Sequence, residues 1–184
     1  FGGPGSGDGQ FVWPRSIALD RAGNIYVSDD YLHRISVFDK DGQFLSKWGN
    51  SGGGNGQLNA PAGIAFDSDD NLYIVDSLNH RVQKFTKDGT PLATFGKQGS
   101  GDGELDMPWG ICIDSTNNVF VADWRNNRVQ KFDANGNLLV KFEGTLSGVG
   151  GLSNPTDVAV DSEGDVYVTD WGNHRVQVYA PNGT

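Results

Sequence analysis

The sequence predicts an all-β repeat protein of four similar units, and three observations support this prediction. Prolines recur every 47 residues, at Pro14, Pro61, Pro108 and Pro155. The stretches 24–38, 71–85, 118–132 and 165–179 keep the same register and are similar to one another. No window has the 3.6-residue apolar period of a helix, so a solenoid of helices is excluded.

Each unit is expected to contain four short antiparallel strands, which the second unit illustrates. Its strands are predicted at residues 63–67, 72–75, 81–85 and 92–95, with a polar loop at 76–80 and a tight Asp88-Gly89 turn. The second strand is apolar at consecutive positions, so both of its faces must be covered. Four such strands per 47 residues match one blade of a β-propeller, in which neighbouring blades cover each other's faces.

The loop and third strand of each unit carry a motif that resembles the NHL repeat. It is written NHRVQKF at residues 79–85, NNRVQKF at 126–132 and NHRVQ at 173–177, while the first copy departs from it with LHRIS at 32–36. The resemblance implies a propeller of typically six blades that serves as a binding module. Such modules include extracellular sensor domains of bacterial kinases and the RNA- or protein-binding ends of tripartite-motif proteins, and an amidating lyase shares the architecture.

The whole chain is predicted to form one propeller region, residues 1–184, with units at about 3–49, 50–96, 97–143 and 144–184. Four units of 47 residues need 188 residues, and the four that the 184-residue chain lacks fall in the outer strand of the last unit. We therefore expect a piece of a longer NHL region. The alternatives are a compact four-bladed ring and self-association with a second copy that completes the propeller.

Composition narrows the classes of partner. The formal net charge of −9 and the pI of about 4.6 oppose a phosphate-binding surface, so nucleic acid is not an expected partner. No apolar run approaches the roughly 18 residues of a membrane span. The single cysteine, Cys112, excludes an intrachain disulfide. It occupies the position of Ala18, Ala65 and Ala159 in the other units, which predicts a small buried residue rather than a reactive thiol.

Two sets of repeated charges are predicted to be structural. An aspartate and an arginine bracket the loop between the second and third strands of every unit, which predicts an ion pair or a hydrogen-bonded clamp in each blade. The pairs are Asp29/Arg34, Asp76/Arg81, Asp123/Arg128 and Asp170/Arg175. Another aspartate begins the first hairpin turn, where its side chain can accept hydrogen bonds from backbone amides. These residues are Asp20, Asp67, Asp114 and Asp161.

The three histidines lack the arrangement of a metal site. His33, His80 and His174 occupy one position of the repeat, so we expect them in different blades, too far apart for one zinc ion. The glycine-rich connections at residues 5–13, 52–60, 99–107 and 146–154 contain no histidine. They also lack the lysine and the helix of a phosphate-binding loop. No metal and no cofactor are therefore expected.

Candidate binding residues lie where the units differ. The loops between second and third strands are predicted to share one rim with the connections between blades, and large aromatic and arginine side chains vary at these positions. Such residues dominate binding hot spots. The candidates are Trp13, Arg15, Tyr31, Met107, Trp109, Trp124, Arg125 and Trp171. The alternative is that Trp124 and Trp171 only cover the neighbouring blade.

We predict a non-catalytic binding or scaffold module that presents this rim to a protein, a peptide or a glycan. A metal-dependent lyase or lactonase-like hydrolase is the first alternative, with Asp157 as the one acidic residue at its position in the innermost strands. RNA binding is the second alternative, and it rests on the resemblance alone.

Overall fold

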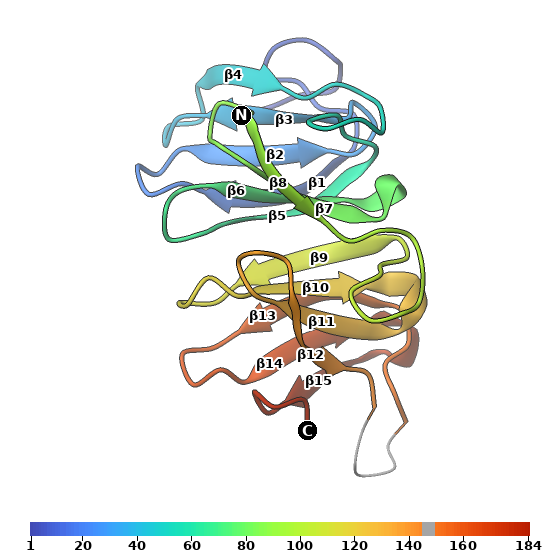
Figure 1. The fold of residues 1–184 in the computed structure, drawn as a ribbon. Helices are drawn as coiled ribbons and strands as arrows, with labels where there is room; N and C mark the ends of the chain where they lie inside the picture. The colour runs from blue at the N-terminus through green and yellow to red at the C-terminus, as the bar shows by residue number, and fades with distance from the viewer. Residues whose placement is uncertain (145–149) are drawn as a thin grey trace.

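The computed structural model describes residues 1–144 and 150–184 and confirms the predicted all-β propeller fold. Its strands form four antiparallel sheets, the blades, whose innermost strands contact one another in chain order (Figure 1). Within these residues, helical structure is limited to three single-turn 3-10 helices, and none is long and apolar enough to cross a membrane.

In each blade the strands lie in chain order, from the innermost to the outermost. The first blade contains β1 (Pro14–Leu19), β2 (Ile25–Asp29), β3 (Arg34–Phe38) and β4 (Phe44–Trp48). The second contains β5 (Pro61–Phe66), β6 (Leu72–Asp76), η1 (Ser77–Asn79), β7 (Arg81–Phe85) and β8 (Pro91–Phe95). The third contains β9 (Pro108–Ile113), β10 (Val119–Asp123), η2 (Trp124–Asn126), β11 (Arg128–Phe132) and β12 (Leu138–Phe142). The fourth contains β13 (Pro155–Val160), β14 (Val166–Asp170), η3 (Trp171–Asn173) and β15 (Arg175–Tyr179).

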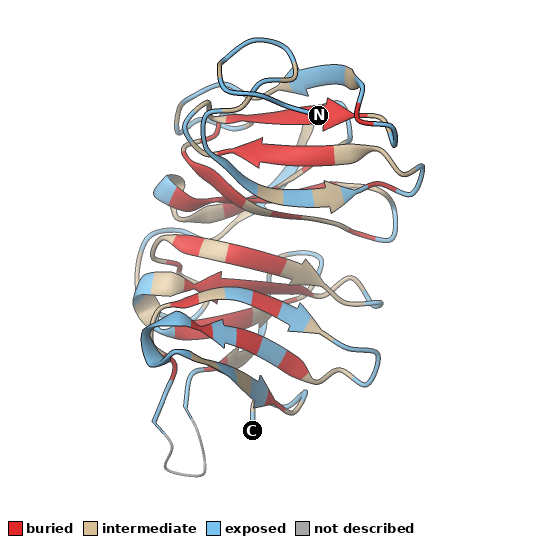
Figure 2. Cartoon of the chain, turned by 180° about the vertical axis from the view of Figure 1, so that it is seen from behind, coloured by how far each residue is buried: buried red, intermediate tan, exposed pale blue. Residues whose placement is uncertain are grey.

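The second strand of a blade is the centre of its packing because both of its faces are covered. β6 and β10 are buried at every position (Figure 2). Tyr73 and Val75 of the second blade pack in one cluster with Val119 and Val121 of the third. Burying an apolar side chain of this size contributes roughly 1.5–3 kcal/mol. Neighbouring blades therefore stabilise each other.

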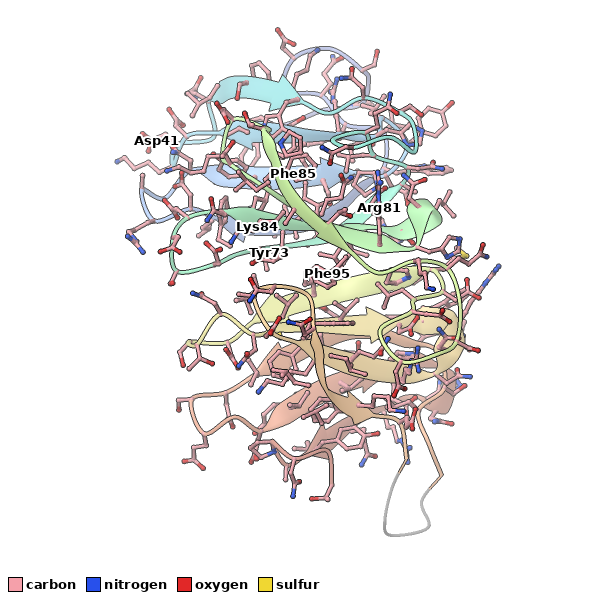
Figure 3. The ribbon with its side chains drawn as sticks, in the orientation of Figure 1. Asp41, Tyr73, Arg81, Lys84, Phe85 and Phe95 are labelled. Atoms are coloured by element: carbon pink, nitrogen blue, oxygen red, sulfur yellow. The ribbon has the colours of Figure 1, made fainter. Side chains whose placement is uncertain are left out.

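Aromatic pairs join successive blades at the outer edge. The ring that ends an outer strand, or Phe1 at the equivalent position, packs on the ring that ends the third strand of the next blade. The centroid distances are 4.7 Å for Phe1–Phe38, 5.2 Å for Trp48–Phe85, 5.0 Å for Phe95–Phe132 and 5.7 Å for Phe142–Tyr179. Phe85 and Phe95 lie at successive junctions of this kind (Figure 3). The repeat of 47 residues thus fixes a contact between units as well as the strands within them.

The predicted aspartate–arginine clamp forms as an ion pair in three of the four blades. The arginine Nε lies 2.7 Å from the aspartate Oδ2 in the second and fourth blades and 2.9 Å in the third. In the first blade the other predicted form, the hydrogen-bonded clamp, takes the place of the ion pair. There Arg34 donates to the backbone carbonyls of Ser6, Gly7 and Gln10, while Asp29 accepts the backbone amide of Leu32. This blade has a hydrogen-bonded clamp instead.

The turn aspartates act as predicted. The Oδ1 of Asp67 accepts the backbone N–H groups of Asp69 at 3.0 Å and Asn71 at 2.9 Å. Lys84 extends over the ring of Tyr73, with its Nζ 2.8 Å from Asp67 Oδ2 (Figure 3). Asp20, Asp114 and Asp161 accept the equivalent pair of amide hydrogen bonds.

Two of the three histidines connect blades, a role that the sequence did not reveal. His80 adopts a left-handed conformation with φ 53° at the end of η1, and its Nδ1 accepts the N–H of Met107 in the next blade at 3.1 Å. His33 accepts the N–H of Ala60 in the same way. The third blade uses Asn127, whose Oδ1 accepts the N–H of Asn154 at 2.9 Å. We call this contact the interblade hydrogen bond.

The connections between blades cross from the outer edge to the innermost strand. Phe11, Leu58 and Leu105 each form a bridge with a residue seven positions earlier in their connection. The connection predicted at 146–154 lies partly outside the described residues. Cys112 on β9 is half-buried and packs against the cluster shared by the third and fourth blades.

Candidate functional site at the mouth of the inner strands

The inner strands of all four blades surround one cavity of about 170 Å³. It is lined by the second and third residues of each inner strand, which are Arg15, Ser16, Ala62, Gly63, Trp109, Gly110, Thr156 and Asp157. We call this end of the inner strands the mouth. The loops and the connections share this end, because the Arg125 N–H donates to the carbonyl of Asp106 at 3.1 Å and the second and fourth blades repeat this bond. In the first blade the Asp30 N–H donates to the carbonyl of Trp13 at 3.0 Å. The predicted shared rim is confirmed.

Arg15 of the first blade meets Trp109 of the third across the mouth. Its guanidinium carbon lies 4.4 Å from the Trp109 ring centroid, and its Nε lies 3.6 Å from Asp30 Oδ2. The second blade carries Ala62 at the position of both residues, and this small side chain, with Ala60 beside it, leaves room for the contact. A cation–π contact at an exposed site contributes about 0.5–1 kcal/mol.

The indole of Trp109 stacks on a second indole of the third blade, that of Trp124. Its ring lies parallel to that of Trp124, with centroids 5.0 Å apart and an interplanar angle of 2°. The guanidinium of Arg125 lies 5.8 Å from the Trp124 centroid. Arg15, Trp109, Trp124 and Arg125 therefore form one row of two stacked rings between two cations, which we call the mouth array. Met107 lines an adjoining cavity of about 200 Å³.

The remaining aromatic candidates flank the array and are open to solvent. Trp13 and Tyr31 of the first blade form an edge-to-face pair with centroids 5.3 Å apart. Trp171 on η3 has 63% of its surface exposed. Trp124 is half-buried, and its carbonyl accepts a hydrogen bond from Asn154 of the fourth blade at 3.3 Å. The Trp124 backbone makes this hydrogen bond, and its indole ring stacks on Trp109.

Asp157 is the acidic residue of the mouth. Solvent reaches its side chain, yet the surrounding wall of inner strands desolvates it and raises the pKa of its carboxyl, which the hydrogen bond from the Val158 N–H only partly offsets. No group of three or more His, Cys, Asp or Glu side chains within residues 1–144 and 150–184 is placed to hold a metal ion. Asp157 therefore lacks the companion ligands that a metal centre needs.

Of the eight predicted binding residues, the structure brings Arg15, Met107, Trp109, Trp124 and Arg125 together at the mouth. Trp13 and Tyr31 pair at the first blade, and Trp171 is exposed at the fourth. Asp30 was not predicted as a site residue, and it joins the site through its ion pair with Arg15. In the sequence Asp30 follows Asp29 directly and occupies the repeat position that holds Trp124 and Trp171 in later units, which marks it as a variable residue of the rim.

Protein-family models match three parts of this fold, two of which overlap. A model of the NHL repeat matches residues 152–179, and a model described as a 6-bladed beta-propeller matches residues 14–85. The model of the SMP-30/Gluconolactonase/LRE-like region matches residues 54–145. The chain belongs to the NHL-repeat β-propeller family. An NHL propeller of this kind supports a binding or scaffold role.

Curated NHL relatives match this propeller over one repeat. Protein lin-41 of Caenorhabditis elegans is 47% identical over 47 residues, which are 26% of this chain and 4% of that protein. NHL repeat-containing protein 3 of Homo sapiens is 47% identical over 47 residues, 25% of this chain and 14% of that protein. The NHL propeller described here therefore spans a small part of these relatives.

Solved structures similar to this NHL propeller share its fold at low identity. A virginiamycin B lyase from Staphylococcus aureus has a TM-score of 0.67 and 18% identity, over 91% of this chain and 55% of that one. A chain of the Nidogen/Laminin complex has a TM-score of 0.68 and 24% identity, over 91% of this chain and 59% of that one. The chain thus spans about half the length of these propellers.

Proposed function

We propose that this NHL propeller is a non-catalytic binding module that holds a protein or peptide partner at its mouth. The observation that carries the proposal is the mouth array, which joins two blades through side chains that the repeat does not fix. A residue that only builds a blade recurs in every blade, as the turn aspartates do. Arg15 and Trp109 each occur once at their position, and Trp124 shares its position only with Trp171 of the fourth blade.

The chemistry of the array suits an acidic and apolar segment of a partner. Tryptophan and arginine are the side chains most enriched at binding hot spots. Arg125 makes no ion pair with another described residue, so its charge is open to a carboxylate of the partner. Trp171 and Trp13 add exposed apolar surface on either side. A glycan could use the same rings, but it would leave the open guanidinium without a charge partner.

Selection of peptides from a random displayed library, followed by titration of the intrinsic tryptophan fluorescence, tests this proposal. We expect selected peptides to carry acidic and aromatic residues. Trp124→Ala should weaken their binding about thirtyfold or more, the 2 kcal/mol typical of a hot-spot aromatic. Leu92→Ala, at an exposed leucine on β8 away from the mouth, is the matched control. Equal affinity of the two folded variants would contradict the site.

An enzymatic role is a second candidate, favoured by the match of residues 54–145 to the SMP-30/Gluconolactonase/LRE-like region and by the raised pKa of Asp157. It would make the chain a metal-dependent lyase or a lactonase-like hydrolase. Metal analysis by mass spectrometry and a lactone-hydrolysis assay, each with wild type and Asp157→Asn, distinguish the candidates. Stoichiometric metal and turnover that are both lost in the variant would favour the enzyme. RNA binding, the third candidate, would instead give retention of labelled RNA on a filter.

A further inference from the structure

A histidine and an aspartate meet at the junction of the second and third blades, beside the mouth. The Nδ1 of His80 accepts the Met107 N–H at 3.1 Å and lies 3.3 Å from the Oδ1 of Asp106. This Oδ1 is buried and accepts no hydrogen bond from the residues that the structure describes. A buried acceptor without a donor is unfavourable. A proton on the His80 ring would supply the missing donor.

The two contacts of His80 exclude each other. In the neutral ring Nδ1 has a lone pair and accepts the Met107 N–H, whereas a protonated Nδ1 can only donate. Histidine is the side chain that ordinarily changes its charge between about pH 5 and 8. A hydrogen bond from an imidazolium to a carboxylate is roughly twice as strong as one between neutral groups. Protonation therefore exchanges the Met107 amide for the Asp106 carboxylate.

The other two junctions form the interblade hydrogen bond without a carboxylate at this position. At the first junction the acceptor is His33, and Asn59 occupies the position of Asp106. At the third junction the acceptor is Asn127, and Ser153 occupies that position. Joining two blades therefore does not require the acid, and Asp106 adds a property that belongs to the second junction.

The charged side chains of the elements packed around His80 have contacts of their own. The ion pairs are Arg81–Asp76 in its own blade, Lys97–Glu104 in the connection and Arg128–Asp123 in the third blade. The guanidinium of Arg125 lies over the ring of Trp124. The side chains of His80 and Asp106 are shielded from solvent, with 16% and 28% of their surface exposed. Within the described part of the chain, Asp106 is therefore the charged group placed to meet a charge on His80.

Met107 carries this exchange to the mouth. Its φ is 47°, a left-handed conformation that is uncommon for a residue with a side chain. Such a conformation persists where surrounding contacts hold it, and the bond to His80 is one of those contacts. Met107 and Trp109 line the same cavity of about 200 Å³. Loss of the interblade hydrogen bond should therefore move Met107 beside the mouth array.

We propose that His80 and Asp106 form a pH-sensitive switch of the mouth. With His80 neutral, the interblade hydrogen bond holds Met107 in its left-handed conformation. With His80 protonated, the ring donates to Asp106 and Met107 is released. The movement of Met107 depends on these contacts alone, whereas its effect on a partner rests on the proposed function. A partner that needs the held conformation binds more tightly when His80 is neutral.

Two-dimensional NMR of the backbone amides between about pH 7.5 and about pH 5.5 tests the switch. In wild type the Met107 amide proton should shift upfield on acidification, because its hydrogen bond is lost. His80→Asn should remove this shift, since Asn127 shows that an asparagine accepts the same bond without a charge. Asp106→Asn should reduce it, because the protonated ring then lacks a carboxylate. His33→Asn, the same substitution at the first junction, is the matched control and should leave the Met107 shift unchanged.

Binding of a selected peptide provides the separate readout of function. The affinity of wild type should fall about two- to tenfold from the upper to the lower pH, the factor that one hydrogen bond supplies, while that of His80→Asn stays constant. A Met107 amide that keeps its position over this range, or that shifts equally in His80→Asn, would overturn the switch. A Met107 shift with unchanged peptide affinity would overturn its effect on the partner. Failure to select any peptide would instead refute the proposed function, and the Met107 shift would still report the exchange at His80.

Discussion

Arg128 donates through Nε to the Oδ2 of Asp123 at 2.9 Å, and both side chains are almost fully buried. The guanidinium also donates to the backbone carbonyls of Ser100, Gly101 and Glu104, at 3.1, 2.8 and 2.8 Å. One side chain therefore ties the connection before the third blade to the hairpin inside it. The pair therefore belongs to the architecture of the blade.

Arg128→Ala should lower the free energy of unfolding by about 3–5 kcal/mol, because it leaves a buried carboxylate without its charge partner. Burial raises the pKa of Asp123, and the hydrogen bonds and the Arg128 charge oppose this only in part, so the carboxyl should take up a proton more readily in the variant. Chemical denaturation measures the loss. Arg125→Ala, three residues earlier and exposed, should stay within about 0.5 kcal/mol of wild type. An Arg128→Ala protein with unchanged stability and lost peptide binding would refute the structural role.

Stability should fall at acidic pH because Asp67, Asp114 and Asp161 in the hairpin turns have lowered pKa values. Burial alone would raise the pKa of Asp114, but hydrogen bonds from Asn118 and Thr116 outweigh it, and the pKa lies below its usual value. A carboxyl with a depressed folded-state pKa contributes stability above its unfolded pKa of about 3.9, and this contribution is lost as the pH falls through the folded value.

Asp114→Asn measures this contribution. The variant should be less stable than wild type at pH 7, and the difference should shrink as the pH falls below about 4. Urea denaturation across this range follows both proteins. A difference that is constant with pH would assign the effect to the shape of the side chain and not to its charge.

The Cys112 thiol should react slowly in the folded protein. Burial, together with the charges of Asp157 and Asp114, raises its pKa to about 12. At pH 8 the thiolate fraction falls from roughly a quarter for an ordinary cysteine to about one in ten thousand. Alkylation by iodoacetamide should therefore be about a thousandfold slower than in guanidinium chloride. Equal rates in the two solvents would show that the third and fourth blades open readily at this position.

The sequence predicted the blades and the clamp because both depend on contacts at fixed spacing within one unit. Asp123 and Arg128 lie directly opposite each other on β10 and β11, so their separation of five residues is enough to pair them. The different clamp of the first blade had a signal in Leu32 and Ser36, which replace an asparagine and a glutamine that bond the aspartate in the second and third blades.

The mouth array could not be predicted in the same way. Arg15 and Trp109 are 94 residues apart and meet only because Ala60 and Ala62 of the intervening blade are small. The parallel stack of Trp109 on Trp124 depends on side-chain rotamers, which the repeat does not constrain. Sequence variation located the rim, and the three-dimensional arrangement was needed to join its residues.

Gly110 lies where two inner strands approach most closely beside the array. A Cβ at this position would sit 2.5 Å from the Cα of Asp157 and 2.7 Å from the carbonyl oxygen of Thr156. Gly110→Ala must therefore push β9 away from β13, and overpacking of this kind costs about 1–3 kcal/mol. The shift should also move the neighbouring Trp109, so the variant should show altered tryptophan fluorescence and weaker binding of selected peptides. Gly144→Ala, where a Cβ meets nothing within 4 Å, is the matched control and should change neither property. A Gly110→Ala protein as stable as wild type would contradict the close approach of β9 to β13 at this position.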